Sequence, residues 1–311
     1  MPPAFVFFGS PQLAVLALEE LKKTGHLPRA VVCQPDKPAG RGNRLRPPAT
    51  KTWALDNNLP VLQPRRCREP DFLEEFKRLG AELGLVFAFG QILPPELLDV
   101  APAGFINIHP SLLPRWRGAA PVQWTLLAGD PQAGVSIIRV TPRLDDGDIL
   151  LQQAVEIHPE ENAEELSRRL AVLGGRMAAE ALEKICTGGL QPRPQDASQV
   201  TWARPLEKND GLIDWSKPAE EICRLVRGTQ PWPGAFTRLR GRTLKIFRAH
   251  ALKLPADASP GKVLEAQGDR LVVAAGSEAV ALLEVQLEGR RRLSAREFLL
   301  GRPLVPGERL E

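Results

Sequence analysis

The sequence predicts an α/β protein in which a Rossmann-like domain with a mostly parallel sheet precedes a small, OB-like β-barrel. In the first part of the chain, short apolar runs alternate with helical patterns, as in βαβ units. Near residue 207 the pattern changes to short apolar runs separated by glycine turns, which is typical of a small barrel. We therefore expect a first domain at residues 1–189, a linker at 190–206 and a second domain at 207–311.

The first expected unit opens with the apolar strand Phe5-Val6-Phe7-Phe8. Gly9 supplies the turn, Ser10 is the expected N-cap, and Pro11 is the expected first residue of a helix. A nicotinamide-binding domain would carry G-x-G-x-x-G here, but Gly9 stands alone, and no P-loop pattern is present. Hydride transfer and P-loop nucleotide hydrolysis are therefore disfavoured.

Further elements follow from periodicity and from the positions of glycine and proline. Apolar runs predict strands at 30–33, 61–62, 83–87, 105–108 and 135–140 and from 149 onward, and three- and four-residue spacing predicts helices at 71–79, 122–127 and 164–185. In the second domain we expect strands at 236–239, 244–249, 262–266, 271–274 and 280–287 and a short helix at 295–300.

Composition narrows the function classes. The formal charge is +4, and the whole excess lies from Glu207 onward, where 18 Lys and Arg residues face 14 Asp and Glu residues. That excess fits either an acidic partner for the second domain or ordinary solvation.

We expect a cytoplasmic protein without a membrane segment, because the chain has no long apolar run and no leader. The cysteines form no C-x-x-C pair, so we expect reduced, structural thiols and no metal.

The segment from Phe105 to Pro121 is the strongest candidate for chemistry. Asn107 and His109 stand two residues apart in an expected strand, so their side chains should face the same cavity. The expected strand pair after it encloses an acidic loop that holds Asp145. An amide donor, a histidine and a carboxylate fit acyl transfer to an external nucleophile, although a histidine at a strand end is also commonly structural. The absence of G-x-S-x-G argues against a covalent acyl-enzyme.

The segment at residues 36–50 is basic and rich in proline and glycine. A stretch of this length without periodicity is either disordered or a binding loop, and the residues alone leave both open.

Several motifs together resemble the folate-dependent formyltransferases. They are Asn107-Ile108-His109, the loop from Ser111 to Gly118, Leu144-Asp145-Asp146-Gly147, FFGSP at the start, DKPAGRG at 36–42, AFGQIL at 88–93, KNDGLIDW at 208–215 and PWPGAF at 231–236. The resemblance covers nearly the whole chain. Within the family, it is closest to the members that act on methionyl initiator tRNA.

This resemblance implies transfer of a formyl group from 10-formyltetrahydrofolate, a co-substrate, to the amine of methionyl initiator tRNA. It assigns Asn107 and His109 to the oxygen of the tetrahedral intermediate, and Asp145 to orienting His109 and relaying the proton, with no metal. It implies a tRNA-binding β-barrel in the second domain, and we expect a monomer. The implied folate-binding residues are Phe89, Gly90, Ile92, Ser111, Leu112, Leu113 and Pro114. The implied tRNA-binding residues are Lys37, Arg41, Arg44, Arg46, Arg240, Arg242 and Lys245.

The chain departs from the family pattern at three positions. Arg139 replaces an apolar or aromatic residue, Pro142 replaces an acidic one, and Pro110 occupies a position where glycine is common. Two rival functions remain: a formyltransferase that acts on a nucleotide-sugar amine, and an RNA-binding protein without catalysis. Arg41 and the basic barrel argue against the first, and the intact Asn107, His109 and Asp145 argue against the second.

Overall fold

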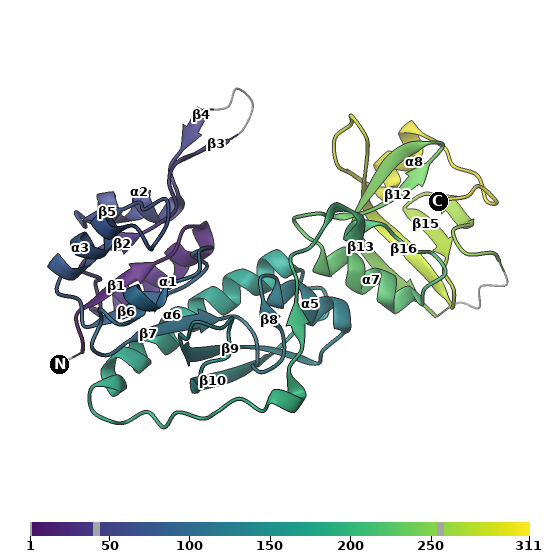
Figure 1. The fold of residues 1–311 in the computed structure, drawn as a ribbon. Helices are drawn as coiled ribbons and strands as arrows, with labels where there is room; N and C mark the ends of the chain where they lie inside the picture. Colours follow the sequence, from purple (N-terminus) through teal and green to yellow (C-terminus); the bar gives the residue numbers. More distant parts are fainter. Residues whose placement is uncertain (1, 40–43, 254–257) are drawn as a thin grey trace. The chain divides into compact units, whose positions relative to one another are not determined.

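The computed structural model describes residues 2–39, 44–253 and 258–311 (Figure 1). The chain forms two compact units. The first comprises Met1–Gly118, Ala133–Val155 and Ser167–Ala203, and the second comprises Ala119–Gln132, Glu156–Leu166 and Arg204–Glu311.

The first unit is built on a seven-stranded sheet. Strand β1 pairs in parallel with β2 and β6, which pair in parallel with β5 and β7, and β9 joins β7 in the antiparallel direction. The expected mostly parallel sheet is therefore confirmed. In sheet order the strands are β10 (Ile149–Glu156), β9 (Gln132–Arg139), β7 (Phe105–His109), β6 (Leu83–Val86), β1 (Phe5–Phe8), β2 (Val31–Val32) and β5 (Val61–Leu62).

Helices cover this sheet and complete its core. On one face, the ring of Phe8 packs against Phe76 of α3 and against Phe105 of β7, with ring centroids 5.8 and 5.5 Å apart. Elsewhere, Gly175 of α6 lies so close to α1 that a Cβ there would come within 2.7 Å of the carbonyl oxygen of Ala17. The helices are α1 (Gln12–Lys23), α2 (Ala49–Asp56), α3 (Pro70–Arg78), α4 (Pro95–Leu98) and α6 (Ala163–Ile185).

The predicted start of the first helix is wrong by one residue. Pro11 has extended backbone angles and is itself the N-cap, so α1 begins at Gln12. The hydroxyl of Ser10 instead accepts a hydrogen bond from the backbone N–H of Gln34 at 3.0 Å. Ser10 therefore joins the turn after β1 to the segment after β2.

The basic segment at 36–50 contains two short strands, β3 (Lys37–Ala39) and β4 (Arg44–Arg46), which pair in the antiparallel direction. Figure 1 shows this hairpin projecting from the first unit, beside α2. Its base is fixed by Asp36, whose carboxylate accepts hydrogen bonds from Lys51 at 2.9 Å and from Gln63 at 2.7 Å. Residues 40–43, including Arg41, lie outside the described part of the chain.

The second unit contains an antiparallel sheet in the order β12-β13-β16-β15-β14, with β17 paired to β16. All five expected strands are present. The C-terminal segment links the two ends of this sheet, because Glu311 exchanges backbone hydrogen bonds with Arg238 of β12 while Glu308 accepts one from Val263 of β14. The strands are β12 (Ala235–Leu239), β13 (Arg242–Leu252), β14 (Val263–Gln267), β15 (Arg270–Ala274), β16 (Ala279–Leu287) and β17 (Leu293–Ser294).

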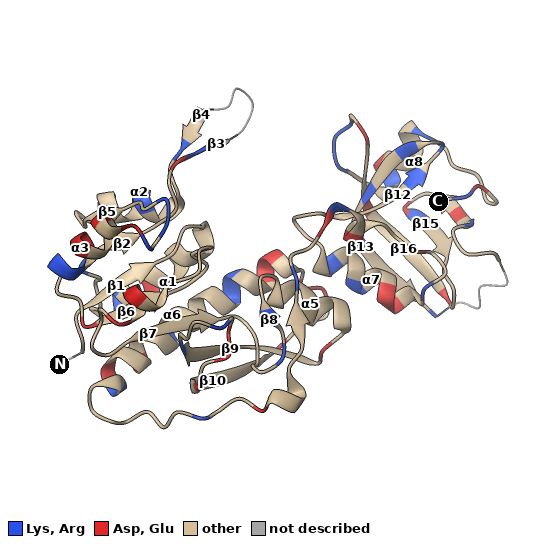
Figure 2. Ribbon diagram, viewed as in Figure 1, with Lys and Arg blue, Asp and Glu red and all other residues tan. Residues whose placement is uncertain are grey.

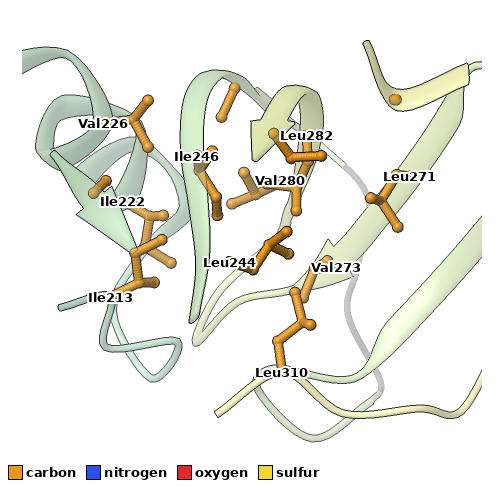
Figure 3. Packing of buried hydrophobic residues seen from close by; sticks show 14 of the residues in the cluster. Ile213, Ile222, Val226, Leu244, Ile246, Leu271, Val273, Val280, Leu282 and Leu310 are labelled. Carbon is orange, nitrogen blue, oxygen red and sulfur yellow. The ribbon is translucent and has the colours of Figure 1, made fainter. Parts of the chain in front are cut away.

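Helices also cover the second sheet. Helix α7 (Ala219–Gly228), which we did not predict, packs against β13 and against α5 (Pro121–Ala128), and α8 (Ala295–Gly301) packs against β16. The buried Ile222 and Val226 of α7 belong to the core that Figure 3 shows, together with Ile246 and Leu282 from the strands. Apolar residues four apart on α7 thus face this core.

Among the described residues, no helix combines the length and the apolar composition that crossing a membrane requires.

Candidate active site

The predicted site residues on β7 lie at the carboxyl end of the parallel part of the sheet. Asn107 stands opposite Val86 in the register of β6 and β7, so the segment after β6 and the segment after β7 leave the sheet side by side. In open α/β sheets, ligands bind beyond this end of the strands. The side chain of Asn107 is half-buried and makes no hydrogen bond within the described part of the chain, so its amide N–H can serve a substrate.

His109 is buried, and a backbone carbonyl fixes one nitrogen of its ring. Its Nε2 lies 2.9 Å from the backbone carbonyl oxygen of Trp116. Because a carbonyl oxygen only accepts, Nε2 carries the hydrogen. The other ring nitrogen, Nδ1, lies 3.6 Å from Oδ2 of Asp145. The structure thus brings together two residues that the family resemblance assigns to one site.

Asp145 comes from the loop between β9 and β10, and its side chain is only 11% exposed. Its Oδ2 accepts a hydrogen bond from the backbone N–H of Gly118 at 2.9 Å. Its backbone lies in the left-handed region, with φ of 50°, which costs about 1–3 kcal/mol for a residue with a side chain. Trp116 has a similar φ of 64°. The surrounding contacts must therefore hold this conformation.

Two glycines allow the loops of the site to approach other backbone segments. A Cβ on Gly147 would lie 1.9 Å from the carbonyl oxygen of Arg139, and one on Gly118 would lie 2.6 Å from that of Ala203. Gly118 also has a φ of 119°. No other residue fits these positions without movement of the backbone.

The segment at 190–206, which we expected to be a linker, contributes to the site. Arg193 forms a bridge with Ile149, and β11 (Trp202–Ala203) pairs with β8 (Arg117–Gly118). The hydroxyl of Thr201 accepts a hydrogen bond from the backbone N–H of Trp116 at 2.9 Å. This segment therefore supports the loop that carries Trp116, Arg117 and Gly118. A polar stretch without periodicity gave no signal of this role.

The three buried cysteines are poor nucleophiles. Burial raises the pKa of Cys33 to about 11 and the pKa values of Cys67 and Cys223 to about 12, so these thiols stay protonated at neutral pH. The pattern of side chains instead suits direct transfer between two bound substrates. The donor on Asn107 is unused within the described part of the chain, and the nearby histidine and carboxylate are each bonded to the backbone.

Comparison with known proteins shows the family to which the chain belongs. The formyl transferase family model matches residues 3–182, and the model of the formyl transferase C-terminal domain matches residues 205–303. The chain belongs to the formyl transferase family. It is 47% identical over 299 residues to the methionyl-tRNA formyltransferase of Anaeromyxobacter dehalogenans, which covers 95% of this chain and 96% of that protein. It is 43% identical over 305 residues to that of Geobacter sulfurreducens, covering 98% and 96%.

Solved structures share the fold at low sequence identity. The sugar 3N-formyl transferase WlaRD is 16% identical, with a TM-score of 0.68, over 94% of this chain and 100% of that chain. HypX from Aquifex aeolicus, crystallised with tetrahydrofolic acid, is 17% identical with a TM-score of 0.65, over 96% of this chain and 47% of that chain. This likeness supports the architecture of the formyl transferase.

The residues expected to bind folate divide into a buried and an accessible set. Phe89 is buried and packs edge-to-face on Phe8 at 5.4 Å, and Leu113 packs with Ile138 and Ile149, so both support the site from within. Ser111 is also buried, and its hydroxyl donates to the carbonyl oxygen of Arg115 at 2.7 Å. The accessible set is Gly90, Ile92, Leu112 and Pro114, of which Ile92 is 84% exposed.

The residues expected to bind tRNA lie on two surfaces. Lys37 and Arg46 face each other across the β3–β4 hairpin and are exposed, whereas the side chain of Arg44 lies outside the described part. In the second unit, Arg240 pairs with Glu308 at 2.6 Å and Arg242 donates to the carbonyl oxygen of Glu288. Lys245 is exposed. Figure 2 shows basic residues on both the hairpin and the second unit.

The departures from the family pattern are compatible with the fold. Arg139 is exposed and keeps its place opposite Ile106 in the ladder between β9 and β7, so the strand geometry is regular there. Pro142 is exposed in the loop before Asp145. Neither residue approaches Asn107 or His109 in any described contact.

Proposed function

We propose that this formyl transferase moves the formyl group of 10-formyltetrahydrofolate onto the α-amine of methionine carried by initiator tRNA. The observation that carries the proposal is the likeness, over nearly the full length of both chains, to proteins named methionyl-tRNA formyltransferase. The arrangement of Asn107, His109 and Asp145 supports it, because these groups suit attack by an external amine.

In the proposed reaction, a bond forms between the amine nitrogen and the formyl carbon, and the bond between that carbon and the folate nitrogen breaks. The amine loses a proton, and the folate nitrogen takes one up. Negative charge develops on the formyl oxygen, and the free amide N–H of Asn107 is the donor that stabilises it. A donor of this kind typically contributes about a hundredfold or more in rate.

We assign the handling of the proton to His109 and Asp145. Since Nε2 of His109 keeps its hydrogen bonded to Trp116, a second donor on this ring requires protonation of Nδ1. The carboxylate of Asp145 lies 3.6 Å from Nδ1. Proton transfer through such a pair is worth roughly 10² to 10⁴ in rate. The side chain of Asp145 is 11% exposed, so solvent can reach it.

The folate would be held beyond the ends of β6 and β7. We assign its flat ring system to the exposed apolar Ile92, to Gly90, whose φ is 82°, and to the half-buried Leu112. Phe89 and Leu113 would support these residues. When bound, 10-formyltetrahydrofolate supplies the activated formyl group.

The tRNA would be held by the basic residues of the β3–β4 hairpin and of the second unit. Lys37 and Arg46 are exposed and suit phosphate contacts, and we propose the same for Arg41, Arg44, Arg240, Arg242 and Lys245. The reaction would take place in the cytoplasm, where aminoacyl-tRNA is consumed.

The test is transfer of labelled formyl from 10-formyltetrahydrofolate to methionyl initiator tRNA, with uncharged tRNA and methionyl elongator tRNA as controls. Transfer to the initiator alone supports the reaction, the acceptor and its specificity. Transfer to a nucleotide-sugar amine with none to any tRNA would overturn the acceptor. Binding of tRNA without any turnover would overturn catalysis.

A further inference from the structure

The side chain of Gln195 is anchored on the loop that presents Asp145. Its Nε2 lies 2.8 Å from the carbonyl oxygen of Asp145 and 2.8 Å from that of Gly147. Its Oε1 accepts hydrogen bonds from Nε and Nη2 of Arg117 at 3.0 and 2.8 Å. The partners fix the orientation of the amide, because carbonyl oxygens only accept and a guanidinium only donates.

These contacts close a ring around Asp145. Arg117 contacts the loop through Gln195, and the next residue, Gly118, donates its backbone N–H to the carboxylate of Asp145. Asp145 is thus held through its main-chain carbonyl on one side and through its side chain on the other. Arg117 is itself fixed, because its backbone N–H donates to the carbonyl oxygen of Thr201 at 3.0 Å.

The loop needs such contacts for the site to keep its geometry. Asp145 has a φ of 50°, a conformation that residues with a side chain adopt only when neighbouring groups hold it. The carboxylate must also remain 3.6 Å from Nδ1 of His109. A displacement of the loop would move the carboxylate away from the ring and from the N–H of Gly118.

We infer that Gln195 is a positioning residue for catalysis: it holds the Asp145 loop in the conformation that places the carboxylate beside His109. The inference rests on the proposed function, in which Asp145 handles the proton. It gives the polar segment before the second unit a role in the chemical step, although Gln195 touches no reacting atom.

The principal test is Gln195→Glu, which keeps the length of the side chain and the acceptor for Arg117 but removes both N–H donors. The matched control is Gln191→Glu, the same change at an exposed residue of the same segment that makes no hydrogen bond in the described part of the chain. Gln195→Asn is a neutral second variant; it is one methylene shorter, so it separates lost reach from added charge.

We expect Gln195→Glu and Gln195→Asn each to lower kcat about tenfold, because a shift of a catalytic group by a fraction of an ångström has effects of this order. KM for either substrate should change less than about twofold, since neither contact is with substrate. Gln191→Glu should behave as the natural chain does. A rise in KM with unchanged kcat, or unchanged kinetics in both variants at position 195, would overturn the inference.

A double-mutant cycle asks whether Gln195 acts through Asp145. In an Asp145→Asn background, adding Gln195→Glu should change kcat by less than about twofold, because the group that it positions is already lost. A full tenfold loss in both backgrounds would mean an independent role and would overturn the inference. If the Asp145→Asn variant kept normal turnover, the proposed role of Asp145 would fail, and the role of Gln195 would fail with it. If Asp145→Asn lowered turnover but Gln195→Glu did not, only the inference about Gln195 would be refuted.

Hydrogen exchange gives a readout that does not depend on activity. The N–H of Gly118, which donates to Asp145, should exchange faster in Gln195→Glu than in Gln191→Glu. Equal protection in the two variants would show that Gln195 does not fix the loop.

Discussion

The Asp145 loop and the β3–β4 hairpin both come from stretches rich in turn-forming or charged residues, yet the structure holds them differently. The Asp145 loop is bonded along its length, through Gly118 and Gln195, and contains a strained residue. The described part of the hairpin is fixed at its base by Asp36 and presents exposed basic side chains. The first arrangement suits chemistry, which requires fixed distances. The second suits a long phosphate backbone, which is bound by charge at several points.

The largest expected effect is a loss of kcat when a residue assigned to the reaction is replaced. Asn107→Ala, His109→Ala and Asp145→Ala should each lower kcat at least about a hundredfold, because each removes a donor or a proton carrier. Binding of tRNA should persist, since none of these residues belongs to the basic surfaces. Formyl transfer under single-turnover conditions and a separate tRNA-binding measurement would check this. Near-normal turnover of His109→Ala would refute the mechanism.

A second test loosens the fixed loop without removing a chemical group. Gly147→Ala would place a Cβ 1.9 Å from the carbonyl oxygen of Arg139, so the loop must shift. We expect the free energy of unfolding to fall by about 1–3 kcal/mol, with a loss of turnover. Gly301→Ala is the control, because a Cβ there meets nothing within 4 Å. Urea denaturation of both variants would measure the difference, and equal stability would mean that the backbone yields freely.

The hairpin should respond in affinity rather than in rate. Lys37→Ala and Arg46→Ala should each weaken tRNA binding a few-fold and lower the slope of log affinity against log salt by about 0.7–0.9, the amount per phosphate contact. Arg240→Ala is the comparison, because its guanidinium is already paired with Glu308 and should contribute less. Titrations at several salt concentrations would decide this. A larger change for Arg240→Ala would make the second unit the main basic surface.

The smallest expected effect concerns the base of the hairpin. Hydrogen bonds from Gln63 and then Lys51 lower the pKa of Asp36 below its usual 3.8. A lowered folded-state pKa stabilises the protein above pH 3.8, and this contribution is lost as the pH falls through the lowered pKa. The difference in melting temperature between the natural chain and Asp36→Asn should therefore be full at pH 6, shrink as the pH falls below 3.8 and disappear below the lowered folded-state pKa. A difference independent of pH would mean that the carboxylate charge does not matter.

Local pattern explains what could be predicted of the fold. Strands such as β1, β7 and β16 were visible because alternating or continuous apolar residues report burial directly. Helix α7 was missed because its start, after Pro218, lies in a polar stretch, and its apolar face shows only at four-residue spacing over a short length. The two strands of the hairpin were missed because their sequence has no apolar alternation.

The sequence by itself determined that Asn107 and His109 share one face of a strand, because the alternation of side chains is a property of the strand alone. Only the tertiary structure decided that Asp145 meets His109 from a different loop, and that Gln195 and Gly118 hold it there. These partners are separated by tens of residues along the chain. A hydrogen bond depends on distance and direction in space, which the order of residues does not contain until the strands and loops have packed.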